Sequence, residues 1–226
     1  MNQLIFLPGF DGNASLRSEF TTALAQRHAV RSVTYPNRVL GSLDGYRDHA
    51  MAQAPVDWNP VLVAESFSGL VAARWAATDS RVRALVLCAS FARNPVGHAA
   101  SLGAILPSLV KLGPALMGNL TWATGDQRRA RWGTGLSHAM ASLDDAVVAE
   151  RLRLIAGEDV SDSLGALQIP VVLVHFESDL VIPGPARAQL EAACRNPRVL
   201  RLEGPHFAIA TRPTECAAAI SASLYA

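Results

Sequence analysis

Residues 61–71 read VLVAESFSGLV, an apolar run followed by small residues around Ser66 and the start of an Ala-rich helix. A serine on a sharp strand-to-helix turn has a strained backbone, so the residues two positions before and after it must be small. Ala64 and Ser68 meet this requirement. Such a turn exposes the hydroxyl, and the following helix directs its free N–H groups to the same place. The stretch therefore predicts a reactive serine at the end of a buried strand.

Ser68 is the second serine of this stretch. If Ser68 occupied the turn, Leu70 would have to be small, and it is not. Ser66 is therefore the candidate nucleophile. The alternative is that both serines only cap the helix, since serine is a favoured N-cap residue.

Short apolar runs alternate with longer helical stretches on both sides of this turn. The expected strands are residues 4–7, 29–34, 61–64, 84–88, 171–175 and 198–202, and the expected helices are 15–27, 43–53, 67–77, 185–193 and 213–224. Two of the strands, 61–64 and 171–175, are continuously apolar, as expected when helices cover both faces of a parallel sheet. The alternation predicts an α/β fold with a doubly wound, mostly parallel six-stranded sheet.

Residues 93–165 interrupt this alternation, because they contain no convincing strand. Three stretches, 102–112, 121–132 and 143–155, have helical composition, with breakers at Gly113-Pro114 and Gly133. A structureless loop of this length is improbable inside a compact domain. The sequence therefore predicts an α/β core formed by residues 1–92 and 166–226, with a helical cap inserted at 93–165. The insertion would serve as a lid over a pocket, and a surface decoration is the alternative.

A serine hydroxyl needs a neighbouring base and an orienting acid to become a good nucleophile. His206 follows a Gly-Pro turn after the last strand, whereas the other five histidines lie in or near expected helices or close a strand. Asp179 follows the strand at 171–175, at the edge where α/β sheets place ligand-facing groups. Glu177 is the competing carboxylate, with a solvated loop charge as its alternative role. The chain order Ser, Asp, His is the order expected for this architecture.

The first expected strand runs into a Pro-Gly-x-x-Gly segment at residues 8–12. Glycine lets this loop approach the active-site floor closely, so that the N–H group of Phe10 can point into the site. Together with the N–H group of Phe67, it would form a two-donor oxyanion hole. An ordinary Gly-rich turn is the alternative.

These motifs resemble those of the α/β-hydrolase superfamily, and the resemblance covers essentially the whole chain. It implies a triad of Ser66, Asp179 and His206, with the amides of Phe10 and Phe67 as oxyanion donors. In size and layout the chain looks similar to small bacterial carboxylesterases, including the pimeloyl-acyl-carrier-protein methyl-ester esterases. The implied fold lacks the two leading antiparallel strands that are common in the superfamily.

The sequence departs from the superfamily pattern at two places. Pro8-Gly9 stands where His-Gly is usual, and Ala64-Glu65-Ser66 stands where Gly-His-Ser is frequent. Neither departure removes a group that the expected chemistry needs.

The resemblance implies a serine hydrolase that cleaves a carboxylic ester or thioester through an acyl-enzyme. Other functions stay open: a receptor-like ligand-binding protein on the same scaffold, an acyltransferase, and a cofactor-free haloperoxidase or lyase. The candidate lining of the acyl pocket, for which core packing is the alternative role, comprises Leu106, Leu109, Leu116, Trp122 and Trp132. Arg128, Arg129 and Arg131 could meet an acidic acyl carrier protein, with a solvated helix face as the alternative.

The composition excludes several other classes of protein. Of 226 residues, 50% are hydrophobic and 17% are charged, which is unlike a disordered chain. The net charge of +1, without a basic run, argues against a nucleic-acid partner. Three widely spaced cysteines favour reduced thiols in the cytoplasm, and no apolar stretch approaches the about 20 residues of a membrane span. No metal-ligand cluster or cofactor fingerprint is present, so we expect neither a metal nor a cofactor.

Overall fold

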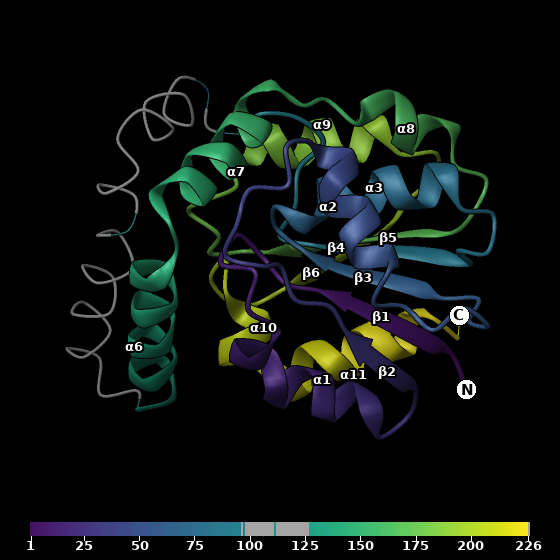
Figure 1. Cartoon of the computed structure of the whole chain (residues 1–226). Coiled ribbons are helices and arrows are strands. Elements are labelled where there is room, and N and C mark those ends of the chain that lie inside the picture. The colour runs from purple at the N-terminus through teal and green to yellow at the C-terminus, as the bar shows by residue number, and fades with distance from the viewer. Residues whose placement is uncertain (96, 98–110, 112–126, 226) are drawn as a thin grey trace.

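The computed structural model describes residues 1–95, 97, 111 and 127–225, with the main chain alone for residues 127–130. Six strands form one sheet in the order β2-β1-β3-β4-β5-β6, and each neighbouring pair is parallel (Figure 1). The strands are β1 (Gln3–Leu7), β2 (Ala29–Ser32), β3 (Val61–Glu65), β4 (Ala84–Cys88), β5 (Val171–Phe176) and β6 (Arg198–Leu202). The predicted doubly wound, six-stranded α/β fold is confirmed.

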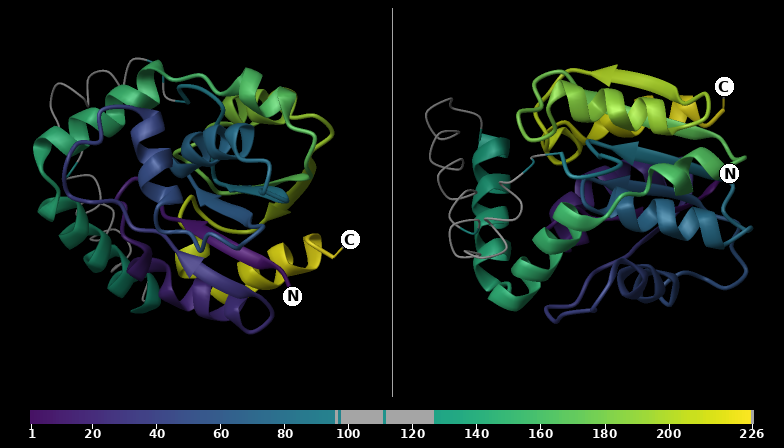
Figure 2. Two further views of the ribbon diagram at one scale, coloured as in Figure 1. Left: turned by 45° about the vertical axis from the view of Figure 1, so that its right-hand side comes forward. Right: turned by 90° about the horizontal axis from the view of Figure 1, so that it is seen from above.

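Helices cover both faces of the sheet (Figures 1 and 2). One face carries α2 (Leu43–Met51), α3 (Ser68–Thr78), α8 (Ser161–Ala166) and α9 (Gly184–Ala193). The other face carries α1 (Ser18–Ala25), preceded by the 3₁₀ helix η1 (Ala14–Arg17), together with α10 (Ala208–Thr211) and α11 (Pro213–Ser223). The remaining described helices, α6 (Gln127–Ser142) and α7 (Asp145–Gly157), lie beyond the carboxyl ends of the strands in Figure 1.

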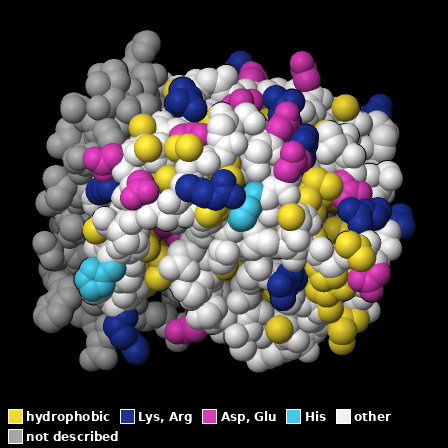
Figure 3. Space-filling model, viewed as in Figure 1, with side chains coloured by type: hydrophobic (Ala, Val, Ile, Leu, Met, Phe, Trp, Pro, Cys, Tyr) yellow, Lys and Arg dark blue, Asp and Glu magenta, His cyan; other side chains and the backbone are white. Residues whose placement is uncertain are grey.

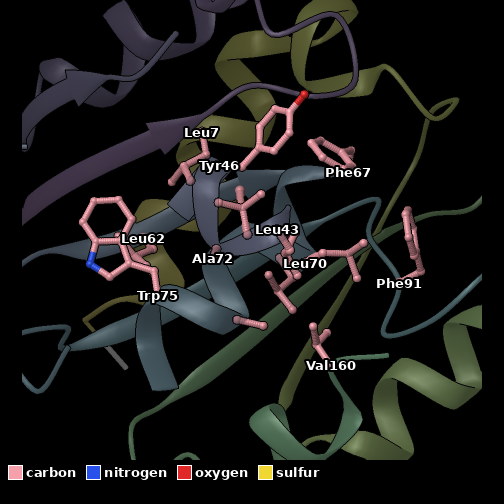
Figure 4. Close-up of a cluster of buried hydrophobic side chains, with 14 of the residues drawn as sticks. Leu7, Leu43, Tyr46, Leu62, Phe67, Leu70, Ala72, Trp75, Phe91 and Val160 are labelled. Carbon is pink, nitrogen blue, oxygen red and sulfur yellow. The ribbon is translucent and has the colours of Figure 1, made fainter. Parts of the chain in front are cut away.

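The strands are apolar on both faces because each face has its own hydrophobic core. Along β1, Ile5 and Leu7 join the core under α2 and α3, whereas Leu4 and Phe6 join the core against α1 and α11. This alternation follows from the two-residue repeat of a strand. Figure 4 shows the first core, in which side chains of α2 and α3, including Trp75, pack over those of the sheet.

The direction of strand addition changes between β1 and β3. The chain passes from β1 to the edge strand β2, then returns to form β3 on the other side of β1. The loops after β1 and β3 therefore diverge at neighbouring positions of the same edge. Open α/β sheets bind their ligands at such a switch point, outside the carboxyl ends of the strands.

The inserted segment leaves and rejoins the sheet region at one place. The N–H group of Val160 donates to the carbonyl of Ala92 over 2.9 Å, and Arg93 forms an isolated antiparallel bridge with Asp159. After this closure, α8 packs against α3 and α9 beside the sheet. Helices α6 and α7, which come before α8 in the chain, thus belong to a segment whose two ends lie side by side.

The predicted helix break at Gly133 is wrong, because α6 continues through this residue to Ser142. A glycine inside a helix costs about 1 kcal/mol, which packing can offset. Leu136 and Met140 of α6 are buried in the core, and a Cβ atom at Gly135 would lie only 3.0 Å from Leu16 of η1. The helix predicted over residues 102–112 lies outside the described residues, apart from Lys111.

The described surface is mixed in charge. Figure 3 shows acidic and basic side chains interspersed over one face of the molecule, in keeping with the net charge of +1. Within the described part of the chain, no helix is both long and apolar enough to cross a lipid bilayer.

Candidate active site

Ser66 lies on a sharp turn between β3 and α3, as the sequence predicts. Its φ of +53° is in the left-handed region, which a residue with a Cβ atom adopts only when surrounding contacts enforce it. Its N–H group donates to Cys88, and its carbonyl accepts from Gly69 and from the Ser90 hydroxyl, each over 2.9 Å. The bonds with Cys88 and Ser90 hold the turn to the end of β4, and the bond from Gly69 closes the turn at the start of α3.

The structure brings Ser66, His206 and Asp179 together at the carboxyl edge of the sheet. Nε2 of His206 lies 3.0 Å from Oγ of Ser66, and Nδ1 lies 2.9 Å from Oδ2 of Asp179. The three residues follow β3, β6 and β5, and lie as far as 140 positions apart in the chain. His206 and Asp179 are buried, whereas Ser66 is partly exposed.

The environment of Asp179 fixes the roles of the two histidine nitrogens. Burial opposes ionisation of this carboxyl, but hydrogen bonds and charge from His206, with the amides of Val181 and Ile182, outweigh burial and lower its pKa. Its other oxygen, Oδ1, accepts from those amides over 2.8 and 2.9 Å. An ionised carboxylate only accepts, so Nδ1 of His206 carries the donated proton. In the neutral ring, Nε2 is then the acceptor for the Ser66 hydroxyl.

Glu177, the competing carboxylate, has a different environment. Its side chain is exposed, and a hydrogen bond to Glu203 followed by the repulsion between the two charges raises its pKa. Its main-chain N–H group donates to the carbonyl of Leu202 over 3.0 Å, which joins the loop after β5 to the loop that carries His206. Asp179, not Glu177, contacts the histidine ring.

Ser68 is not available to act as the reactive serine. Its side chain is fully buried, and its hydroxyl donates to the carbonyl of Pro8. Since this bond uses the single Ser68 proton, the Tyr35 hydroxyl must donate to Oγ of Ser68, over 2.8 Å. The second serine therefore fixes the loop after β1, which is a structural role.

The carbonyl groups of the loop after β1 are held from two sides. Ser68 binds the Pro8 carbonyl from α3, and Nη1 of Arg151 binds the Phe10 carbonyl from α7 over 2.5 Å. Arg151 is fully buried, and its guanidinium also lies over the Tyr35 ring. The loop is thus fixed by the sheet region and by the inserted segment together.

Some amide N–H groups of the same loop donate hydrogen bonds within the described part of the protein, and others do not. The N–H group of Gly9 donates to Oε2 of Glu65 over 3.0 Å, and that of Gly12 donates to the Gly9 carbonyl over 3.0 Å. By contrast, the N–H groups of Phe10 and Phe67 donate to no acceptor among the described residues. Two unused donors therefore remain on the loops that flank Ser66, where the sequence predicts an oxyanion hole.

Of the predicted pocket residues, Trp132 is the one that the structure describes. It lies on α6 with its ring centroid 4.5 Å from that of Phe207, which in turn contacts His206 at 4.8 Å. Leu106, Leu109, Leu116 and Trp122 lie outside the described residues. Arg131 is exposed on α6, and the side chains of Arg128 and Arg129 lie outside the description.

Sequence reasoning missed several residues that build this site. Arg151 lies 141 positions from Phe10 in the chain, and no local motif announces the contact. Glu65 carried a signal, since it is the only charged residue in the stretch from 61 to 73. Among the described residues, no three His, Cys, Asp or Glu side chains are arranged to hold a metal ion.

A parallel sheet with a serine on a strained turn, a histidine that contacts this serine and a carboxylate that contacts the histidine defines the class of α/β hydrolases. The sequence comparison agrees with this class. The chain belongs to the alpha/beta hydrolase family, whose model matches residues 4–219. A search of curated protein sequences found no match.

Solved structures with the same fold have varied activities. The enol-lactonase from Burkholderia xenovorans superimposes with a TM-score of 0.80 at 14% identity, over 100% of this chain and 92% of that chain. The bromoperoxidase from Bacillus anthracis gives a TM-score of 0.79 at 16% identity, and an esterase from Exiguobacterium antarcticum gives 0.80 at 12%, both with the same coverage. At these identities the likeness establishes the shared fold alone.

Proposed function

We propose that the protein is a serine hydrolase that cleaves a carboxylic ester or thioester through an acyl-enzyme. The observation that carries this proposal is the 3.0 Å contact between Nε2 of His206 and Oγ of Ser66. The opposite ring nitrogen faces an ionised Asp179, so Nε2 is an acceptor that can take the serine proton.

Acylation begins when Oγ of Ser66 attacks the acyl carbon and Nε2 of His206 takes its proton. The π electron pair of the carbonyl moves to its oxygen, and the N–H groups of Phe10 and Phe67 stabilise that oxyanion. When the carbonyl reforms, the bond to the alkoxy or thiolate group breaks, and Nε2 returns the proton to this leaving group. Asp179 keeps the ring oriented and stabilises its charged form.

Deacylation repeats these steps with water as the nucleophile. His206 takes a proton from water, the hydroxyl adds to the acyl carbon, and Ser66 leaves with the proton that Nε2 returns. The products are a carboxylic acid and the free enzyme. This scheme requires no cofactor.

The named relatives support hydrolysis but leave the substrate open. The similar structures include an esterase, an enol-lactonase and a bromoperoxidase. Trp132 and Phe207 would give the acyl group an apolar wall beside His206. We therefore place the substrate among small acyl esters or thioesters, with Leu106, Leu109, Leu116 and Trp122 as further proposed lining residues.

Replacement of Ser66 by alanine tests the proposal. We expect Ser66→Ala to lower the turnover of a p-nitrophenyl ester by about 10⁴–10⁶-fold, because the nucleophile is lost. Circular dichroism should be unchanged. Ser80→Ala, at an exposed serine after α3, is the matched control and should keep full activity. A fully active Ser66→Ala protein would refute the proposal.

Fluorophosphonate labelling separates the alternatives on the same scaffold. A hydrolase should be labelled at Ser66 and should also turn over its ester many times. Labelling without turnover would indicate a receptor-like protein, and product formation only with an added alcohol or thiol would indicate an acyltransferase. Both outcomes would contradict hydrolysis.

Partner and compartment are further parts of the proposal. An acyl carrier protein would dock near the arginines of α6, of which Arg131 is exposed. Turnover of a carrier-bound thioester would then be more sensitive to salt than that of a free ester. The three cysteines are unpaired and buried, which supports a reducing compartment such as the cytoplasm.

A further inference from the structure

A buried ion cluster lies directly behind the proposed oxyanion site. Arg17 of η1 contacts two carboxylates, Oδ2 of Asp11 through Nη1 and Oε2 of Glu65 through Nε, each at 2.7 Å. All three side chains are at most 2% exposed. Because buried charges are costly even when paired, such a cluster next to a proposed active site calls for a functional explanation.

Glu65 connects the two chain segments that carry the oxyanion donors. It is the last residue of β3 and immediately precedes Ser66, with Phe67 one position further. The same Oε2 atom that binds Arg17 accepts the N–H group of Gly9, the residue before Phe10, over 3.0 Å. One carboxylate oxygen therefore reaches from the serine turn to the loop after β1.

The contact leaves little space for adjustment. A Cβ atom at Gly9 would lie 3.2 Å from Oε2 and 3.3 Å from the carboxyl carbon of Glu65. Arg17 also contacts this carboxylate, its Nη2 atom would lie 3.4 Å from the same Cβ, and Asp11 of the loop is paired with Arg17. Glu65 thus contacts the loop through an amide group of Gly9, whereas Ser68 and Arg151 hold its carbonyl groups.

We propose that Glu65 is a positioning residue, which fixes the N–H group of Phe10 relative to that of Phe67 so that both reach the same oxyanion. The inference rests on the proposed function. Glu65 touches neither substrate nor Ser66 Oγ in this role, and acts only through the loop at Gly9. Because the oxyanion is absent from the bound substrate and develops only in the transition state and the tetrahedral intermediate, a displaced loop should lower kcat and leave KM nearly unchanged.

The chemistry of Glu65 supplies a test by conservative replacement. Oε2 makes both contacts, whereas the buried Oε1 atom has no hydrogen-bond partner. A glutamine can therefore place its carbonyl oxygen at the Oε2 position, where it keeps the hydrogen bond from Gly9 and a close contact with Arg17, but an alanine loses both contacts. We expect Glu65→Ala to lower kcat by about 10–100-fold with KM changed less than about threefold, and Glu65→Gln to restore most of kcat.

A transition-state analogue gives a second readout, which a general loss of stability would not move. A boronic acid forms a tetrahedral adduct with a reactive serine, so its inhibition constant should rise in Glu65→Ala in proportion to the fall in kcat. Asp79→Ala is the matched control, because Asp79 is also a buried carboxylate paired with an arginine, at the far end of α3. It should lose stability and keep kcat.

A third variant tests the geometry if Glu65→Ala does not fold. Gly9→Ala keeps every charge and only forces the loop away from Glu65 by a few tenths of an ångström. We expect it to lower kcat by about tenfold. Unchanged kcat in both Glu65→Ala and Gly9→Ala, or equal losses in Glu65→Ala and Glu65→Gln, would overturn the inference. Absence of turnover and labelling in the wild-type protein would instead refute the proposed function.

Discussion

At Gly69 the structure has no room for a methyl group. A Cβ atom there would lie 1.8 Å from Oγ and 2.8 Å from Cβ of Ser90, whereas the third neighbour, Cδ2 of Leu87, lies at 3.4 Å. Ser90 approaches so closely because its hydroxyl donates to the Ser66 carbonyl. The peptide that contains this carbonyl also contains the Phe67 N–H group, so Ser90 fixes the direction of one proposed oxyanion donor.

The first prediction at this scale is a compensating pair of substitutions. We expect Gly69→Ala to lower the free energy of unfolding by about 1–3 kcal/mol, because Ser90 must move and lose its bond to Ser66. Adding Ser90→Gly removes both close atoms and should recover part of that loss. Urea denaturation of the single and double variants measures the coupling.

Gly157 provides the control for this pair. It ends α7, and a Cβ atom there would meet nothing within 4 Å. Gly157→Ala should change the free energy of unfolding by less than about 0.5 kcal/mol. Strictly additive effects of Gly69→Ala and Ser90→Gly would show that the two residues do not conflict.

The residues that a sequence motif can reveal are those fixed by local geometry. Ser66 directly follows a strand, and Asp179 and His206 lie in the loops just after two others, so the strand pattern alone predicts that they share one edge of the sheet. Arg17 and Arg151 reach the site from helices, through contacts that depend on how those helices pack. The sequence contains no local rule for such packing, which is why these two arginines were not predicted.

At the scale of elements, α3 shows how one carboxylate ends a helix. Asp79 is the C-cap residue, and its Oδ2 atom accepts from the Trp75 indole N–H over 3.1 Å. The hydrogen bond from the Arg81 side chain, together with smaller effects of the Trp75 hydrogen bond and of the Arg81 charge, outweighs burial and lowers the pKa of Asp79 to about 2. The end of the helix is thereby tied to the buried indole of its last turn.

The second prediction follows from this pKa. Asp79→Ala leaves the buried Trp75 indole without an acceptor, so we expect a loss of about 2 kcal/mol in the free energy of unfolding at pH 7. Because the folded-state pKa lies below the ordinary 3.8, the ionised form stabilises the fold fully above about pH 4. This contribution declines as the pH falls toward 2. Urea denaturation at pH 7 and pH 3 should therefore give a smaller gap between wild type and variant at pH 3.

A gap that is equal or larger at pH 3 would contradict this assignment. Glu177→Gln is a suitable comparison, since Glu177 is exposed and its pKa is raised by Glu203. The contribution of Glu177 to the pH dependence of the free energy of unfolding has the opposite sign, because the folded protein binds the Glu177 proton more tightly than the unfolded chain does.

The elements themselves were predictable to different extents. All six strands lie within two residues of the predicted bounds, because short runs rich in apolar and β-branched residues between turn residues have few other interpretations. The helix α6 was not predictable past Gly133, since its glycines favour a break when read locally. Packing against η1 and α10, which the local sequence does not contain, overrides this preference.

At the scale of the molecule, the inserted segment is fastened to the sheet region by two buried residues of α7. Glu150 accepts the N–H groups of Leu40 and Gly41 over 2.9 and 2.6 Å. Its neighbour Arg151 binds the Phe10 carbonyl and donates to the Tyr46 hydroxyl over 3.1 Å. The contact between Arg151 and the Phe10 carbonyl joins the insertion to the loop that carries a proposed oxyanion donor.

The third prediction is that the contacts of Arg151 support both the stability of the protein and its turnover. Arg151→Met keeps the length of the side chain but leaves the Phe10 carbonyl and the Tyr46 hydroxyl without their donor, and removes the cation from the tyrosine rings. We expect a loss of about 2–4 kcal/mol in the free energy of unfolding and a lower kcat, because the loop after β1 is released. Arg151→Lys should be intermediate, since an ammonium cannot reproduce the planar contacts of a guanidinium.

Arg153 on the same helix separates this effect from a general loss of positive charge. Its side chain is 66% exposed and lies 3.9 Å from Glu150, so Arg153→Met should change stability by less than about 0.5 kcal/mol and leave kcat unaltered. Equal behaviour of the Arg151→Met and Arg153→Met proteins would mean that the insertion holds its position without the buried guanidinium. A loss confined to Arg151→Met, in both urea denaturation and ester turnover, would make the inserted helices part of the machinery that orients the loop after β1.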